Sequence, residues 1–423
     1  MPEMKDSGID WIGMVPKGWS IKPIRADFEE VTEKNKRGLV QNALKFTYGS
    51  IVPKENFDAD NDDYVADTIL GYTVVTPGTI MLNGLNLNFD FVSQRIGLVK
   101  NTGVITSAYI AFRAIDSNGI SPEFVAYLLK SYDSCKAFHN MGGGVRKILN
   151  FSELKKQYIV YPSLDEQFRI AGFLDSKCAE IDALTADIQS QIDTLEQYKR
   201  SVITEAVTTG LNPDAEMKDS GIPWANFVPA HWMSSKIKYE IFPLQRLVHS
   251  SDLVMTCFRD GEVTLRQNRR EDGFTISITE NGYQGVEVGD LVIHGMDAFA
   301  GAIGCSDSRG KITPVVHVCK TTGNNRFFMY VLRSMAANDV LMSFAEGIRV
   351  RSSDFRNFNK LGKFPIEVPP VNEQNDIVGF LDQKCGKIDA IIVQKKEQIE
   401  ILAEYKKSLI FEYVTGKKEV TMA

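Results

Sequence analysis

MKDSGI at residues 4–9 recurs as MKDSGI at residues 217–222, and matching aromatic and proline residues follow each copy. These residues are Trp11, Val15, Pro16 and Trp19 after the first copy and Trp224, Val228, Pro229 and Trp232 after the second. Repetition at this level indicates that the chain contains two modules of similar structure.

A second repeat follows the two modules. Residues 165–208 align without a gap to residues 372–415, and 22 of the 44 positions are identical. The identical stretches include EQ at 166 and 373, GFLD at 172 and 379, KC at 177 and 384, IDA at 181 and 388, and YK at 198 and 405. The predicted order is a first module (1–162), a first helical segment (163–210), a second module (211–369), a second helical segment (370–416) and a tail (417–423).

Each helical segment predicts one long helix with an apolar seam. Apolar residues recur every seven positions, and no proline interrupts residues 168–207. Such a stripe predicts a helix of about 40 residues, roughly 60 Å long. The first seam contains Leu174, Ile181, Ile188, Leu195 and Val202, with Cys178, Leu184, Ile192 and Tyr198 at alternate positions. The second contains Leu381, Ile388, Leu402 and Leu409, with Lys395 in place of an apolar residue.

A long helix with a single apolar stripe must bury that stripe, and the other copy is the nearest partner. Because a module separates the two helices in the sequence, we expect them to pair in antiparallel orientation. This arrangement predicts a pseudo-two-fold axis, with residues 4–9 beside the end of the second helix. The alternative is that each stripe pairs with a separate partner protein.

Both modules have the pattern of mixed α and β structure. Short apolar runs bounded by Gly, Asn, Asp and Pro predict strands, and amphipathic patterns predict one helix per module. The strand runs are 74–81, 104–112, 286–293 and 312–318, and the helices are 122–132 and 325–335. The predicted fold class is α+β: two similar mixed α/β modules joined by two long antiparallel coiled-coil helices.

The composition is that of an ordinary globular chain, with 43% hydrophobic and 24% charged residues. No apolar run approaches the roughly 18 residues that a membrane span needs, and the N-terminus lacks a signal pattern, so we expect a cytoplasmic protein. The six cysteines include no C-x-x-C pair. They predict buried thiols rather than disulfides or metal ligands.

The net charge of −6 hides an uneven distribution. Residues 1–162 and residues 211–369 each hold 18 basic and 18 acidic side chains, whereas residues 163–210 hold 4 basic and 9 acidic ones. Neutral modules do not bind a polyanion through bulk charge alone, but each can still carry a basic face.

The sequence contains no recognisable catalytic constellation. There is no G-x-x-x-x-G-K-[ST] loop for phosphate and no glycine-rich turn in a clear strand-to-helix context. The five histidines have no spacing suited to zinc, and none is shared between the modules. We therefore expect no catalytic residue, metal site or cofactor in this chain.

Glycine-rich loops are the first candidates for binding. GGGVRK at residues 142–147 exposes backbone N–H groups and allows close approach to a phosphate or base, while Arg146 and Lys147 supply positive charge. GIRVR at residues 347–351 has the comparable place in the second module, with two arginines, Arg349 and Arg351. Flexible loops with solvated arginines are the alternative interpretation.

Polar loops are the second candidates. Arg, Gln and Asn side chains can form paired hydrogen bonds with guanine or adenine edges, and lysines can contact phosphates. The candidates for DNA binding are Arg266, Gln267, Asn268, Arg269 and Arg270 in the second module, and Asn83, Asn86, Asn88, Gln94, Arg95, Lys34, Lys36 and Arg37 in the first. Ordinary solvated loops are again the alternative.

The duplicated MKDSGI, EQ and GFLD motifs make the chain similar to a type I restriction-modification specificity subunit, along nearly its whole length. The resemblance implies that the modules are target recognition domains, each reading one half of a split double-stranded DNA site. It implies that the helices set the spacing and dock methyltransferase (modification) subunits. It also implies that this chain is not an enzyme: S-adenosylmethionine, ATP and magnesium would bind to the modification and restriction partners.

Two other functions fit parts of the sequence. A duplicated interaction scaffold without DNA binding is compatible with the neutral modules. A nuclease or methyltransferase in its own right would need a catalytic constellation, which the sequence lacks.

Overall fold

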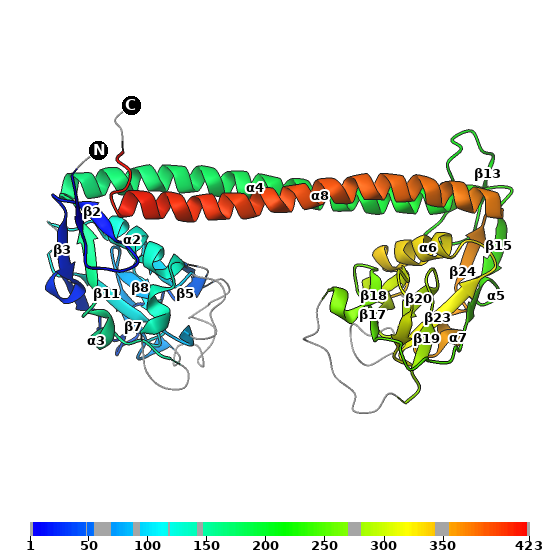
Figure 1. Cartoon of the computed structure of the whole chain (residues 1–423), viewed down its shortest axis with the longest axis horizontal. Coiled ribbons are helices and arrows are strands. Elements are labelled where there is room, and N and C mark those ends of the chain that lie inside the picture. The colour runs from blue at the N-terminus through cyan, green and yellow to red at the C-terminus, as the bar shows by residue number, and fades with distance from the viewer. Residues whose placement is uncertain are drawn as a thin grey trace. The chain divides into compact units, whose positions relative to one another are not determined.

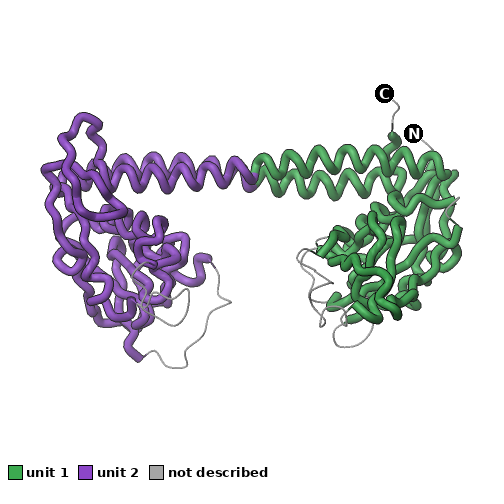
Figure 2. The backbone as a smooth tube through the Cα atoms, turned by 180° about the vertical axis from the view of Figure 1, so that it is seen from behind, with its two compact units in different colours: residues 1–188, 397–423 green, residues 189–396 purple. Residues whose placement is uncertain are grey.

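The computed structural model describes residues 3–47, 49–54, 69–87, 94–116, 119–141, 147–269, 281–342 and 355–420. The chain forms two compact units, which Figure 2 shows in different colours. Unit 1 comprises residues 1–188 and 397–423, and unit 2 comprises residues 189–396. Each unit therefore contains one module together with part of each long helix.

A four-stranded antiparallel sheet forms the centre of unit 1 (Figure 1). Its strand order is β4 (Phe28–Glu30), β11 (Ile110–Ala114), β8 (Ile80–Leu82), β9 (Ile96–Leu98). The two-stranded pairs are β1 (Met4–Asp6) with β2 (Met14–Pro16), β3 (Ser20–Pro23) with β12 (Tyr158–Tyr161), β5 (Leu44–Thr47) with β6 (Ser50–Pro53), and β7 (Thr73–Val75) with β10 (Gly103–Ile105).

Strand β8 shows how this sheet is buried on both faces. Successive side chains of a strand point to opposite faces. Ile80 and Leu82 accordingly belong to the main core, whereas Met81 belongs to a second apolar cluster, and all three are fully buried. A strand covered on both sides is continuously apolar, and the sequence of β8 is Ile-Met-Leu.

Helix α2 (Pro122–Ser134) packs on this sheet, and Phe124 and Leu128 enter the main core. The side chain of Ser121 caps the helix by accepting a hydrogen bond of 3.2 Å from the backbone N–H of Phe124. Helix α3 (Phe151–Leu154) follows. The predicted module helix is confirmed.

Unit 2 repeats the same topology. Its sheet has the order β16 (Ile241–Pro243), β23 (Val316–Thr321), β20 (Leu291–His294), β21 (Ile303–Cys305). The pairs are β13 (Met217–Asp219) with β14 (Phe227–Pro229), β15 (Met233–Lys236) with β24 (Pro365–Val368), β17 (Met255–Cys257) with β18 (Val263–Leu265), and β19 (Gln284–Val286) with β22 (Gly310–Ile312). The helices are α5 (Ile237–Glu240), α6 (Asn325–Ala337) and α7 (Phe358–Leu361), and α6 confirms the second predicted module helix.

Each predicted strand run contains two strands with a turn between them. In the run 74–81 the turn includes Gly78, with a φ of 86°, and in the run 286–293 it includes Gly289, with a φ of 85°. Glycine adopts this left-handed conformation without steric cost. The predicted positions were therefore correct, but each run turns once.

The long helices are α4 (Leu164–Thr209) and α8 (Val371–Val414), of 46 and 44 residues. The prediction of one uninterrupted helix in each repeat is confirmed. Most of the predicted seam residues are buried, namely Leu174, Ile181, Ile188, Val202, Leu381, Ile388 and Leu409, while Leu195 and Leu402 are partly exposed.

Two alternate seam positions were predicted wrongly. Leu184 and Tyr198 are 48% and 46% exposed. The seam advances by four and three residues in turn, so Thr185 and Lys199 stand where the next inward-facing positions fall, and both are partly buried.

In unit 1, α4 and α8 pack in antiparallel orientation. The rings of Phe173 and Tyr413 lie with centroids 4.5 Å apart, and Lys406 Nζ lies 2.6 Å from Asp182 Oδ1. As the residue number rises along α4, that of its neighbour on α8 falls.

In unit 2 the same relation holds. Lys199 Nζ lies 2.6 Å from Asp389 Oδ2, and Lys395 donates a hydrogen bond to Gln191. The antiparallel pairing predicted from the stripes is therefore confirmed in each unit. The ammonium of Lys395 therefore bonds to a side chain of α4 and is not buried among the apolar seam residues.

The N-terminal segment of unit 1 packs against the end of α8, as predicted. Lys417 Nζ donates to the backbone oxygen of Ile12 at 2.8 Å. Val15 and Trp19 share one apolar core with Val414. The repeat of this segment in unit 2, β13 and β14, lies at the corresponding end of α4, where Trp232 shares a core with Val207.

The cysteines are all free thiols. Cys178, Cys257, Cys319 and Cys385 are buried, Cys305 is partly exposed and Cys135 is exposed. The prediction of buried thiols was wrong for Cys135, which follows the last residue of α2 and so lies past the face that packs on the sheet.

Candidate nucleic-acid interface

The hairpin β17–β18 carries the polar loop of the second module. The short helix at Arg266–Asn268 follows β18 directly. Arg266 Nε donates to Thr256 Oγ1 at 3.1 Å, and Asn268 Nδ2 donates to Thr264 Oγ1 at 2.8 Å. Gln267 is exposed. The hairpin thus orients two of the predicted binding side chains and leaves Gln267 open to solvent.

Arg269 is tied to the turn of the same hairpin. Its guanidinium lies 2.6 Å from Asp260 Oδ2 and 3.0 Å from Glu262 Oε2, and 4.2 Å from the ring centroid of Phe258. The bond to Asp260 is the main cause that raises the pKa of Arg269. An exposed ion pair of this kind can exchange its carboxylates for phosphate oxygens.

Arg95 organises the polar loop of the first module. It is 6% exposed, and its guanidinium donates to the backbone oxygens of Asn83 at 2.8 Å, Leu85 at 2.7 Å and Asn86 at 3.3 Å. Asn86 has a φ of 52°, a left-handed conformation that asparagine tolerates. Arg95 therefore shapes the loop from within, while Gln94 beside it is exposed.

In the basic turn at residues 34–37, Lys34 bonds to other residues of the module, whereas Lys36 and Arg37 are exposed to solvent. Lys34 Nζ donates to Ser107 Oγ at 2.5 Å and to Thr73 Oγ1 at 3.1 Å. Lys36 and Arg37 are exposed, and their side chains have no hydrogen bond or ion pair among the described residues. These two are the cations of the turn that are available to a phosphate.

Several predicted binding residues lie outside the described residues: Asn88, Arg146, Arg270, Arg349 and Arg351. Lys147 is described and exposed. Its φ is 38°, and its Nζ donates to the backbone oxygen of His139 at 3.2 Å.

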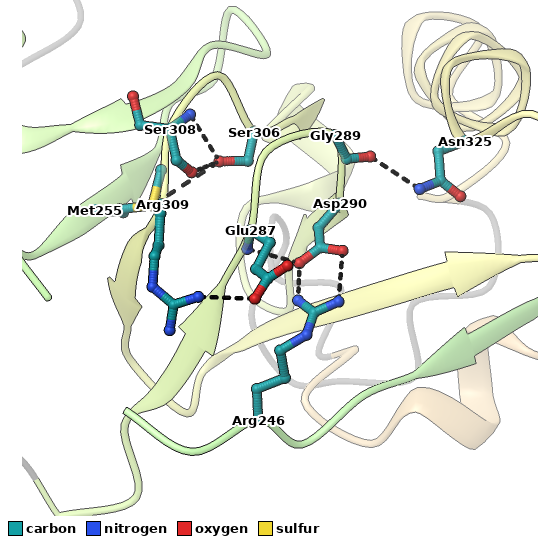
Figure 3. Close-up of polar contacts among 9 residues, drawn as sticks. All are labelled: Arg246, Met255, Glu287, Gly289, Asp290, Ser306, Ser308, Arg309 and Asn325. Carbon is teal, nitrogen blue, oxygen red and sulfur yellow. Dashed lines mark hydrogen bonds and ion pairs between the residues drawn. The ribbon is translucent and has the colours of Figure 1, made fainter. Parts of the chain in front are cut away.

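An ion-pair network that the sequence reasoning missed holds further loops of the second module (Figure 3). Arg246 Nη2 donates to Asp290 Oδ1 at 3.0 Å, and Arg309 Nη1 donates to Glu287 Oε1 at 2.7 Å. Arg309 Nε also donates to Asp252 Oδ1 at 3.1 Å. These arginines serve the framework of the module.

The same network continues through the turn between β19 and β20. Asp290 Oδ2 accepts from the backbone N–H of Glu287 at 2.8 Å, and Asn325 Nδ2 donates to the oxygen of Gly289 at 2.8 Å (Figure 3). Asn325 begins α6, so this contact ties the turn to the module helix. No sequence motif marks the contact of Asn325 with Gly289 or that of Arg246 with Asp290, because these partners are 36 and 44 positions apart along the chain.

A buried glutamine joins each module to its long helix. Gln167 Oε1 accepts from the backbone N–H of Ser121 at 2.9 Å, and its Nε2 donates to Pro162 O at 3.0 Å. Gln374 makes the equivalent bonds in unit 2, to Asn324 N–H and Pro369 O, both at 2.9 Å. Both glutamines bond to the residue that caps the module helix.

A tyrosine and an aspartate form a second duplicated junction. Tyr127 Oη donates to Asp175 Oδ1 at 2.7 Å, and Tyr330 Oη donates to Asp382 Oδ1 at 2.7 Å. Burial, followed by these bonds, raises the pKa of both phenols well above the usual range. The repeated EQ and GFLD motifs contain Gln167, Gln374 and both aspartates, but their partners could not be read from the sequence.

Sequence comparison finds a family match over most of the first module and the first part of α4. Residues 44–194 match the family model of the type I restriction modification DNA specificity domain. The match confirms the predicted resemblance. No curated protein sequence matches this chain.

Solved structures resemble this chain along most of its length. One, described as the structural basis underlying complex assembly and conformational transition of the type I R-M system, has a TM-score of 0.67 and 15% identity. It aligns 96% of this chain with 99% of its own, so the fold is shared over nearly the whole length. The HsdS subunit from Thermoanaerobacter tengcongensis aligns 96% of this chain with 98% of its own, at 15% identity and a TM-score of 0.47.

The described part of the chain contains no group of three or more His, Cys, Asp or Glu side chains that could hold a metal ion. Among the same residues, no helix has the length and hydropathy needed to cross a bilayer. The candidate binding residues that the structure describes lie on polar and basic loops next to strands, and loops held by a rigid scaffold are suited to binding.

Proposed function

We propose that this chain is the DNA sequence-specificity subunit of a type I restriction-modification complex, in which each module reads one half of a bipartite double-stranded site. The observation that carries the proposal is the match of residues 44–194 to the DNA specificity domain, together with the recurrence of the same topology in unit 2. A duplicated fold with different polar loops suits the reading of two different half-sites.

Independent reading can be tested with exposed residues of the two modules. The complex would be assembled with its methyltransferase partner, and methylome sequencing would define the two half-sites. Gln267→Ala in unit 2 and a Lys36→Ala/Arg37→Ala variant in unit 1 should then each alter methylation at sites defined by one half only, or weaken binding without changing sequence preference. If either variant changes both half-sites, the modules do not read independently.

We infer that the helices set the distance between the half-sites. Four residues inserted after Gln189 add about 6 Å and a rotation near 40° to α4. At about 3.4 Å per base pair, the unspecified gap should lengthen by one or two base pairs. A matched insertion after Lys396, which lies nearly level with Gln189 in the antiparallel register of unit 2, should restore stability. Retained activity with an unchanged gap in methylome sequencing would show that the helices do not measure DNA.

Exposed apolar side chains on the long helices support docking of methyltransferase subunits. In unit 1, Leu184 and Tyr405 are 48% and 54% exposed, and in unit 2 the repeated positions Ile391 and Tyr198 are 42% and 46% exposed. Apolar residues of this size at solvent favour a protein partner. Two equivalent sets favour two copies of that partner.

Stoichiometry tests the docking. A Leu184→Lys/Tyr405→Lys variant should bind one methyltransferase subunit instead of two, as measured by native mass spectrometry, and Ile391→Lys/Tyr198→Lys should do the same. Ser190→Lys, at an exposed polar position of α4, is the control and should retain two. Two bound subunits in both double variants would place the docking surface elsewhere.

The chain is proposed to bind no S-adenosylmethionine or ATP and to catalyse nothing alone. Isothermal titration calorimetry with each compound should give no heat of binding at micromolar concentrations. Salt-dependent DNA binding by the assembled complex separates this function from a scaffold without DNA binding. Methylated DNA produced by the chain alone would instead establish an enzyme.

A further inference from the structure

A cavity of about 420 Å³ lies in unit 2, where α6 and the turn between β17 and β18 meet α4 and α8. Ile203, Met329 and Cys305 contribute apolar atoms to its lining, and Arg333 contributes a guanidinium. Its volume falls in the range of about 300–1,000 Å³ that is typical of small-molecule pockets.

Arg333 is the unusual group in this lining. Its side chain makes no hydrogen bond or ion pair with any residue that the structure describes. The guanidinium covers Gly261 so closely that a Cβ on that residue would lie 1.3 Å from Nη1. Burial lowers the pKa of Arg333, whereas the charge of Asp260 raises it. The side chain is only partly exposed, and a guanidinium without a protein acceptor can pair with an oxyanion through two parallel hydrogen bonds.

Other cations of the lining already have partners. Arg326 lies 2.6 Å from Asp382, and Lys199 lies 2.6 Å from Asp389. These pairs leave Arg333 as the cation of the lining that can take a new anion.

The carboxylates of the turn limit the charge of that anion. Asp260 and Glu262 share one cation, Arg269. The charge of Asp260 also acts on Arg333, so the cavity has no excess of positive charge, and these carboxylates would repel a dianion more strongly than a monoanion.

We propose that unit 2 holds a binding site for a small organic monocarboxylate. The carboxylate pairs with the guanidinium of Arg333, and the apolar body of the ligand packs on Ile203 and Met329. In unit 1 the position equivalent to Arg333 is Lys130, whose ammonium lies 5.4 Å from the ring centroid of Tyr127 and lacks the planar fork of arginine. The expected stoichiometry is one ligand per chain.

Calorimetric titration of the full chain with three probes tests the charge. The probes are 2-naphthoate, the neutral 2-naphthamide and the doubly charged 2-naphthyl phosphate. We expect 2-naphthoate to bind with a dissociation constant of about 1 mM or lower, and at least about tenfold more tightly than the other two. Absence of binding, or equal binding of the amide, would overturn the proposal.

Three variants test whether the ligand binds in this cavity, beside Arg333. Arg333→Gln should remove the preference for the carboxylate. Gly386→Leu should block the cavity that Gly386 lines, because its added side chain meets no atom within 4 Å at the Cβ and leucine favours the helix. Gly379→Leu is the matched control, since this residue lies on the same helix with equal space but outside the lining. Undiminished binding of 2-naphthoate to folded Gly386→Leu would also overturn the proposal.

Discussion

Units 1 and 2 agree where the module meets the helices and differ where the module meets solvent. Gln167 and Gln374 make the same bonds, and Asp182 and Asp389 hold equivalent lysines. The polar loops differ: a buried Arg95 shapes the loop in unit 1, whereas the hairpin that carries Arg269 presents the loop in unit 2. The duplicated part is therefore the junction between each module and the long helices. The part that varies between the units is the set of polar loops exposed to solvent.

The equivalence of the two junctions between module and long helix can be tested at Gln167 and Gln374. Gln167→Leu leaves a buried N–H and a buried carbonyl without a partner, and Gln374→Leu leaves a partly buried N–H and a buried carbonyl, so each should lower the free energy of unfolding by about 2–4 kcal/mol. Chemical denaturation gives the magnitude, and hydrogen exchange locates the loss in the unit that carries the change. Exposed Gln197→Leu is the control. A loss confined to one glutamine would break the comparison.

The difference between the loops should appear in DNA recognition. Arg146→Ala and Arg349→Ala should each reduce affinity for one half-site by about 1–3 kcal/mol if the side chains contact bases. Binding would be measured on duplexes in which one half-site at a time is scrambled. If the arginines meet phosphate only, affinity will fall equally for all sequences and the salt slope will shrink by about one. Variants with unchanged affinity and preference would exclude these loops from the interface.

The two units also differ in the cation on the module helix, which is Lys130 on α2 and Arg333 on α6. Burial, followed by repulsion from Lys406, lowers the pKa of Lys130. Between that lowered pKa and the usual value of about 10.4, the unfolded state binds more protons than the folded state, so the free energy of unfolding of the wild type should rise with pH in this window.

Lys130→Met should therefore raise the free energy of unfolding at neutral pH by roughly 0.5–2 kcal/mol. This gain should shrink as the pH approaches the usual lysine value. Denaturation of both proteins across pH 7–11 measures it. A lower stability of the variant at pH 7 would show that the charge of Lys130 is compensated.

The smallest expected effect concerns the seam pairs. Asp182→Asn and Asp389→Asn should each cost about 0.2–1 kcal/mol, because both aspartates are more than half exposed. Double-mutant cycles with Lys406→Met and Lys199→Met should give equal coupling energies in the two units, and both should weaken with added salt. Unequal couplings would show that the helical pair differs between units.

The fold was largely predictable because its determinants are periodic and repeated. Heptad spacing predicted α4 and α8, and apolar runs predicted the strands near residues 74–81. Periodicity failed at Leu184 and Tyr198, because the seam alternates steps of four and three residues and a strict count of seven from the wrong start lands on the exposed face.

The candidate site was less predictable because polar side chains have no period. The sequence distinguishes neither Arg95, which bonds to its own loop, nor Lys34, which bonds to Ser107, from the exposed Lys36 and Arg37. These outcomes depend on partners up to 73 positions away. Tertiary contacts decide whether an arginine is a framework residue or a binding residue, and a single sequence does not contain them.

The two stretches that make up unit 1 impose an order on synthesis. Unit 2 is continuous from residue 189 to residue 396, so a ribosome delivers all of it before Leu409 and Val414, which complete the core of unit 1 around Trp19. Domains emerging during translation generally fold as units, the N-terminal one first. Here the module that is made first receives its last core residues after the module that is made second, and until then the apolar surface around Trp19 has no α8 against it.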